Sequence, residues 1–171
     1  MFQVFYPERY VSSAYEISYE TLREQGVRGV IFDIDNTLVP HGAPADERAL
    51  ALFARLKALG MQTCLLSNNQ EPRVASFAGQ VDSLYIFKGG KPAVKNYHRA
   101  MEMMGTDCST TVFVGDQLFT DVYGAKRAGI PNILVKPIHP KEEIQIVFKR
   151  KLEALVLWEY KRQRGERQDE D

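Results

Sequence analysis

The alternation of short apolar runs with amphipathic segments is the feature of this sequence that most restricts its fold. Several of the apolar runs are apolar throughout, which is typical of parallel strands covered on both faces. These runs cover residues 27–34, 61–66, 83–87, 110–114 and 131–136. Helical patterns lie between them, at residues 45–59, 70–79, 92–104 and 119–128. The order predicts an α/β fold with a Rossmann-like, doubly wound parallel sheet.

Glycine and proline indicate where the helices begin and end. A glycine just past each helical pattern predicts its C-terminus, and these residues are Gly60, Gly79, Gly105 and Gly129. Pro92 is predicted to occupy the first position of the third helix. An N-terminal extension at residues 1–26 and a C-terminal helix at about residues 141–163 complete the chain.

Length, charge and cysteine content restrict the class of protein. A chain of 171 residues, 44% of them apolar, suits one domain over residues 1–171. Lys plus Arg and Asp plus Glu number 22 each, so no nucleic-acid partner is expected. Cys64 and Cys108 are too few for a disulfide framework or a thiolate zinc site. With neither a signal peptide nor a membrane-spanning run in the sequence, we predict a cytoplasmic protein.

Polar side chains follow four of the predicted strands. In chain order they are Asp33 and Asp35, then Ser67, Asn68 and Asn69, then Lys91, then Asp116 after Gly115. In an open parallel sheet the ligand site lies outside the carboxyl ends of the strands. Residues distant in the sequence are therefore predicted to share one site.

The chemistry of these residues favours phosphoryl transfer. Two aspartates about 4 Å apart repel by roughly 1 to 4 kcal/mol. We therefore expect a bound cation or a shared proton to offset the repulsion between Asp33 and Asp35. With Asp116 they make an oxygen-rich site that suits Mg²⁺. One strand-end aspartate can attack phosphorus while the other acts as general acid and base. Ser67, Asn68 and Lys91 are the candidate phosphate-binding residues.

Four segments resemble the ordered motifs of the haloacid dehalogenase (HAD) superfamily. They are DIDNT at residues 33–37, Ser67, Lys91 with Pro92, and GDQLFTD at residues 115–121. The resemblance implies that Asp33 is the nucleophile and Asp35 the general acid and base. It also implies that Asp33, Asp116 and the backbone carbonyl of Asp35 hold Mg²⁺, and that Asp121 supports the metal shell.

The DNTL form of the first motif is similar to subclass IIIA phosphatases of the YqeG type, which are related to phosphatidylglycerophosphate phosphatases. Residues 38–66 and 68–90 leave no room for a cap domain. The resemblance therefore implies a phosphorylated substrate that is large or surface-bound, for example a phospholipid at the inner face of the membrane. It is also compatible with a homo-oligomer.

The last helical segment is amphipathic and basic. Its apolar stripe is Ile144, Phe148, Leu152 and Leu155, with Lys149, Arg150, Lys151, Lys161 and Arg162 around it. We predict that the stripe packs on the sheet, the alternative being contact with an anionic bilayer. Arg73, early in the second helical pattern, is predicted to be solvated instead of binding phosphate.

Two other functions are compatible with a doubly wound domain that carries acids and a lysine. A receiver-like phosphoacceptor module would carry its acceptor aspartate on the third strand, whereas here the Asp33–Asp35 pair comes first. A non-catalytic binding protein of the same fold would be expected to have lost Asp33, Asp35 or Asp116, and all three are present.

Overall fold

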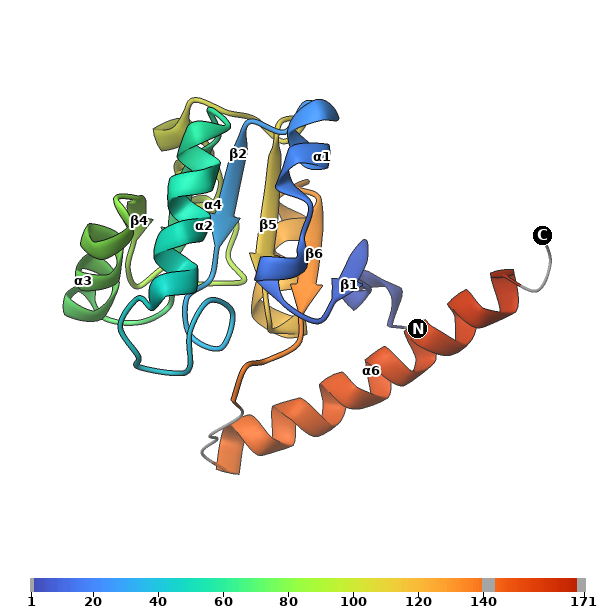
Figure 1. Ribbon diagram of the computed structural model, residues 1–171. Helices are drawn as coiled ribbons and strands as arrows, with labels where there is room; N and C mark the ends of the chain where they lie inside the picture. The colour runs from blue at the N-terminus through green and yellow to red at the C-terminus, as the bar shows by residue number, and fades with distance from the viewer. Residues whose placement is uncertain (1, 140–143, 169–171) are drawn as a thin grey trace.

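The computed structural model describes residues 2–139 and 144–168 (Figure 1). Six parallel strands form one sheet in the order β1-β6-β5-β2-β3-β4. They are β1 (Arg9–Val11), β2 (Gly29–Phe32), β3 (Gln62–Leu66), β4 (Leu84–Ile86), β5 (Thr111–Gly115) and β6 (Asn132–Val135). The chain leaves β2 toward β3 and β4 and returns on the other side to β5. The strand order therefore reverses between β2 and β5, where an α/β sheet binds its ligand.

Helices cover both faces of the sheet (Figure 1). They are α1 (Tyr19–Glu24), α2 (Glu47–Ala58), α3 (Glu71–Val81), α4 (Lys95–Met104) and α5 (Tyr123–Arg127). β2 serves both sides, because Val30 and Phe32 pack with α1, α2 and α3 while Ile31 packs with α4 and α5. Three single turns, Gln3–Phe5, Ala14–Glu16 and the π-helical Leu118–Val122, complete the described elements before residue 140.

The predicted α/β fold is confirmed, including the absence of a cap domain. Residues 33–61 contain one helix, α2, and residues 67–83 contain one helix, α3. Each segment forms only the connection from one strand to the next. The carboxyl ends of the strands are therefore not covered by an inserted domain.

Two predicted helix boundaries are wrong. Gly79 lies inside α3, and the left-handed residue that ends the helix is Asp82, with φ 55°. Aspartate adopts this conformation more readily than most residues, so the turn did not need a glycine. Pro92 is not helical: the Lys91–Pro92 peptide bond is cis and α4 begins at Lys95.

The N-terminal extension contributes to the sheet. β1 was not predicted, and it pairs in parallel with β6 with Arg9 opposite Ile133. Tyr19 and Leu22 of α1 are buried in the core on one face. The described part of the extension, residues 2–26, is thus built into the α/β unit and does not lie apart from it.

The C-terminal helix α6 (Ile144–Gln168) differs most from its prediction. Leu152 and Leu155 do not pack on the sheet, since they are 44% and 51% exposed. The buried face instead carries Val156, which packs with Leu118 and Leu134, and Tyr160. The predicted residues 141–143, and the side chains of Ile144 and Phe148, lie outside the described residues.

Figure 1 shows α6 crossing below the carboxyl ends of β5 and β6 and running on past the N-terminal segment. None of the described helices combines the length and the apolar run needed to cross a membrane.

Candidate active site

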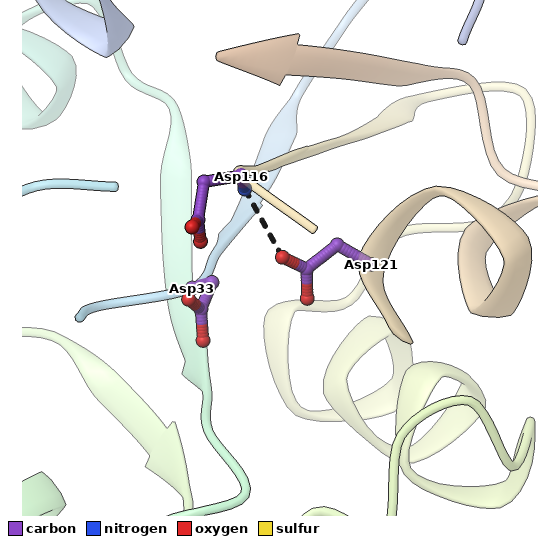
Figure 2. A group of neighbouring side chains, drawn as sticks. All are labelled: Asp33, Asp116 and Asp121. Carbon is purple, nitrogen blue, oxygen red and sulfur yellow. Dashed lines mark hydrogen bonds between the residues drawn. The ribbon is translucent and has the colours of Figure 1, made fainter. Parts of the chain in front are cut away.

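Three carboxylates meet at the carboxyl edge of the sheet, where the strand order reverses. Asp33 follows β2, Asp116 follows β5, and Asp121 comes from the π-helical turn. One carboxylate oxygen of each lies within 4.8 Å of the others. All three side chains are buried, and Figure 2 shows them directed toward a common space. The predicted convergence of residues distant in the sequence is therefore present.

Lys91 joins two of these acids. Its ammonium donates to Asp33 Oδ1 at 2.8 Å and to Asp121 Oδ1 at 2.7 Å. Burial alone would favour neutral lysine, but the charges of Asp121 and Asp33 outweigh it and raise the pKa of Lys91. Lys91 is therefore a fixed positive charge beside the acids.

Asp121 is held by the backbone that follows β5. Its Oδ2 accepts hydrogen bonds from the N–H groups of Asp116 at 3.1 Å and Gln117 at 3.0 Å; Figure 2 draws the first. Gly115 makes this approach possible, because a Cβ added there would lie 2.6 Å from Asp121 Cγ. Gly115 and the backbone N–H of Asp116 thus fix the position of the Asp121 carboxylate relative to Asp116.

The charge balance of this cluster suits a divalent cation. Burial raises the pKa of Asp33 well above its usual value, with Lys91 offsetting part of the effect. Burial also raises the pKa of Asp116 to about 6, with Asp121 adding to the rise. Hard carboxylate oxygens are the ligands that Mg²⁺ prefers, and its charge would keep the acids ionised together. The residues present therefore fit a magnesium ion.

The side chain of Asp35 is bound outside the three-acid cluster. Its Oδ1 accepts from the Gly42 N–H at 2.8 Å and from Arg73 at 2.9 Å, and its Oδ2 accepts from Asn69 at 3.4 Å. Burial opposes ionisation, but the bonds from Gly42 and Arg73 outweigh it and lower the pKa of Asp35. The prediction of a solvated Arg73 is wrong, because the side chain is 16% exposed and paired with Asp35.

Ser67 and Asn68 lie at the end of β3, as predicted, but with different surroundings. Ser67 is buried, and its hydroxyl accepts the Asn69 N–H at 3.1 Å, which leaves the hydroxyl proton for another partner. Both functional groups of the Asn68 amide are bonded to the Lys91 backbone, the oxygen to its N–H at 2.8 Å and the nitrogen to its carbonyl at 3.2 Å. Asn68 therefore positions the lysine loop.

Comparison with known proteins decides the family. Residues 44–129 match the model of the haloacid dehalogenase-like hydrolases. The chain is also 38% identical over 162 residues to the probable phosphatase YqeG of Bacillus subtilis, covering 92% of each chain. The chain belongs to the haloacid dehalogenase-like hydrolases.

Two further proteins are similar to this chain, one in sequence and one in fold. It is 27% identical over 152 residues to phosphatidylglycerophosphate phosphatase 1, chloroplastic/mitochondrial, of Arabidopsis thaliana, covering 82% of this chain and 44% of that protein. Its fold matches a subfamily III A HAD hydrolase from Legionella pneumophila with a TM-score of 0.53 at 17% identity, covering 71% and 72% of the two chains. The predicted resemblance, fold and phosphoric monoester hydrolase class are confirmed.

Besides Arg73, two residues of α6 contact this HAD site without having been predicted to do so. Arg150 donates to Asp116 Oδ2 at 2.7 Å and to the Asp116 carbonyl at 3.0 Å. Glu153 accepts from Arg150 at 2.9 Å and from the Leu118 N–H at 3.1 Å. Both lie beyond the range that the family model matches. The only sequence signal was an arginine and a glutamate three positions apart on an amphipathic helix, a spacing also common on solvated surfaces.

Proposed function

We propose that this HAD phosphatase is Mg²⁺-dependent and hydrolyses a phosphomonoester through an aspartyl-phosphate on Asp33. One observation carries the proposal: buried Asp33 shares a site with Asp116 and Asp121, while Lys91 bridges Asp33 and Asp121. Such a cluster of acids and a lysine supports phosphoryl transfer better than a structural role, because burying like charges is costly unless they are compensated. This arrangement does not favour the receiver-like and non-catalytic alternatives.

The first step transfers the phosphoryl group to the enzyme. A carboxylate oxygen of Asp33 forms a bond to phosphorus as the bond from phosphorus to the ester oxygen breaks. Asp35 gives a proton to the leaving oxygen, which departs as an alcohol. Because Gly42 and Arg73 favour ionised Asp35, proton donation requires that substrate binding weakens these contacts.

The second step releases phosphate. Asp35, now ionised, removes a proton from water, whose oxygen attacks phosphorus while the bond to Asp33 breaks. Inorganic phosphate and the free Asp33 carboxylate are the products. Ser67 and Lys91 stabilise the phosphoryl oxygens in both steps, and Asn68 supports Lys91 through its backbone.

Asp33, Asp116 and the backbone carbonyl of Asp35 would hold the magnesium ion, with Asp121 in support. When bound, Mg²⁺ neutralises charge on the transferring phosphoryl group. Lys91 and Arg150 alone leave three buried acids incompletely compensated, which supports this assignment.

We propose a large or surface-bound phosphate ester as the substrate. No inserted domain covers the carboxyl edge of the sheet, so the site suits a phosphate carried by a bulky group. The similarity to a phosphatidylglycerophosphate phosphatase supports a phospholipid. The whole chain, residues 1–171, would then act as one domain, as a cytoplasmic protein at the inner face of the membrane.

The test uses purified protein and the soluble ester p-nitrophenyl phosphate. After verified removal of divalent ions we expect no turnover, and Mg²⁺ should restore it. A phosphoenzyme trapped by acid should be released by hydroxylamine, and Asp33→Asn should be folded, inactive and unlabelled. Full turnover without metal would refute the Mg²⁺ assignment, and labelled Asp33→Asn would show that the nucleophile is another residue.

A further inference from the structure

The solvent-facing side of α6 carries four exposed residues in one line. Lys151, Leu155, Trp158 and Arg162 are spaced four, three and four residues apart, so they lie on one stripe of the helix. We call these four residues the outer stripe. Glu153, Val156 and Tyr160 are buried on the opposite side, against Leu118 and the N-terminal segment. The helix is thus seated through one face and open to solvent on the other.

The apolar members of the outer stripe are unusually exposed. Trp158 is 60% exposed and Leu155 is 51% exposed. Trp158 is also the only tryptophan in the chain, and the Arg162 guanidinium lies 5.1 Å from its ring centroid. Large apolar side chains left in water next to one another indicate an interaction surface.

The exposed charges of α6 between residues 149 and 165 are all positive. Lys151 and Arg162 lie in the outer stripe, while Lys149, Lys161 and Arg164 lie on other sides of the helix, Lys161 over the Tyr10 ring and Arg164 over the Tyr160 ring. Between residues 149 and 165 no acid is exposed, because Glu153 is buried and Glu159 is half-buried. This local excess stands out in a chain whose positive and negative side chains balance at 22 each. The partner that fits is therefore anionic and has an apolar layer behind its charge.

We infer that the outer stripe of α6 docks on an anionic lipid bilayer. Helices that lie in the membrane interface combine leucine and tryptophan with lysine and arginine, as the outer stripe does. A second copy of this chain fits less well, since pairing two outer stripes about a two-fold axis would set the cations of one against those of the other.

The position of α6 relates this surface to the catalytic edge. Arg150, one residue before the outer stripe begins, contacts Asp116, so this part of α6 lies beside the three acids. Figure 1 shows the helix crossing below the carboxyl ends of β5 and β6. A bilayer docked on the outer stripe would lie on the side of the molecule that carries this edge, with α6 next to the membrane surface. Docking itself does not depend on the reaction, whereas its use to present a lipid ester rests on the proposed function.

Trp158 provides a direct probe of docking. The full-length protein is titrated with vesicles of phosphatidylglycerol and phosphatidylcholine, and with vesicles of phosphatidylcholine alone. We expect its emission to shift to shorter wavelength with the anionic vesicles, and to be quenched by lipids brominated in the acyl chain. High salt should reverse the shift, because the cations supply much of the attraction.

Matched variants separate the outer stripe from the general surface. Leu155→Asp should lower vesicle affinity at least about tenfold, while Leu50→Asp, at a leucine 44% exposed on α2, should not. Replacing Lys151 and Arg162 by glutamine should lower the affinity for anionic vesicles by a factor of about five for each charge removed. The same change at exposed Lys95 and Arg99 of α4 is the control. Circular dichroism and turnover of p-nitrophenyl phosphate should be unchanged in all four variants.

Several results would overturn the inference. One is a tryptophan emission that does not shift with anionic vesicles, or that shifts equally with the two kinds of vesicle. Another is a Leu155→Asp variant that binds anionic vesicles as well as the unmodified protein does. A third is an emission that shifts with protein concentration when no lipid is present. The last result, with a dimer in sedimentation, would assign the outer stripe to a second copy. Fluorescence reports docking even if no ester is hydrolysed, so failure of docking and failure of the proposed function are distinguishable.

Discussion

Arg150 holds Asp116 by both its backbone and its side chain. One guanidinium nitrogen lies 2.7 Å from Asp116 Oδ2, and the other lies 3.0 Å from the Asp116 carbonyl. Glu153 orients the same guanidinium and also binds the Leu118 N–H. The loop after β5, which carries a proposed metal ligand, is thereby anchored to a helix far along the chain.

The first prediction tests this anchor. Arg150→Gln should lower kcat/KM for p-nitrophenyl phosphate about 10- to 100-fold at saturating Mg²⁺, because Asp116 loses two of the hydrogen bonds that orient it and keeps the one from the Thr37 hydroxyl. Arg150→Lys should be intermediate, since an ammonium cannot make both bonds in the same geometry. Lys149→Gln, at the exposed neighbour, is the control and should match the unmodified protein. If Arg150→Gln instead binds Mg²⁺ more tightly with kcat unchanged, Arg150 competes with the metal and does not position Asp116.

The second prediction concerns the glycine beneath Asp121. In Gly115→Ala the new Cβ would lie 2.6 Å from Asp121 Cγ, so the carboxylate must shift from the position in which it accepts a hydrogen bond from Lys91. We expect a loss in kcat/KM of about 100-fold and a loss of about 1 to 3 kcal/mol in the free energy of unfolding. Steady-state kinetics and urea denaturation measure the two effects.

Gly79→Ala is the matched control for the second prediction. Gly79 lies inside α3 with no atom within 4 Å of an added Cβ. Alanine there should raise the free energy of unfolding by roughly 0.5 to 1 kcal/mol and leave the kinetics unchanged. Full activity in Gly115→Ala would mean that Asp121 does not need its observed position.

The sequence predicted the part of the site that local patterns encode. Asp33 and Asp116 directly follow strands whose apolar runs are unmistakable, so sheet topology alone brings them together. Arg150 could not be found in this way, because its partner lies 34 residues earlier and nothing local marks a surface arginine as paired. The same reason applies to Arg73, which reaches 38 residues back to Asp35.

Elements that depend on tertiary contacts were also missed. β1 has three residues, RYV, and becomes a strand only because β6 offers an edge to pair with. The buried face of α6 was predicted at the wrong residues, since Val156 and Tyr160, like Leu152 and Leu155, are spaced as residues of one helical face. Which face is buried depends on where the N-terminal segment lies, and periodicity does not encode that.

The third prediction separates the two steps of the reaction. Asp35→Asn should slow turnover by a factor of about 10² to 10⁴, the usual loss when a general acid and base is removed. p-Nitrophenolate leaves without needing a proton, so with that ester the phosphoenzyme should still form and then accumulate. Rapid quenching with acid measures the accumulation. Undiminished turnover of an alkyl phosphate would show that Asp35 does not transfer protons.

The fourth prediction tests how the helices behind the site are packed. A Cβ added at Gly124 of α5 would lie 2.5 Å from Tyr97 Cζ, and the Tyr97 hydroxyl donates to the Thr120 carbonyl at 2.7 Å, one residue before Asp121. Gly124→Ala should therefore lower the free energy of unfolding by about 1 to 3 kcal/mol through overpacking.

A double-mutant cycle in urea checks the cause of that loss. Tyr97→Phe alone gives up one hydrogen bond, about 0.5 to 1.5 kcal/mol. It also removes the hydroxyl that a Cβ at Gly124 would meet first, so the double variant should be more stable than the sum of the two single losses predicts. Additive losses would mean that Gly124→Ala acts through the backbone of α5 and not through contact with Tyr97. Because Thr120 adjoins Asp121, the same cycle measured on kcat/KM reports whether this packing also sets the position of the acid.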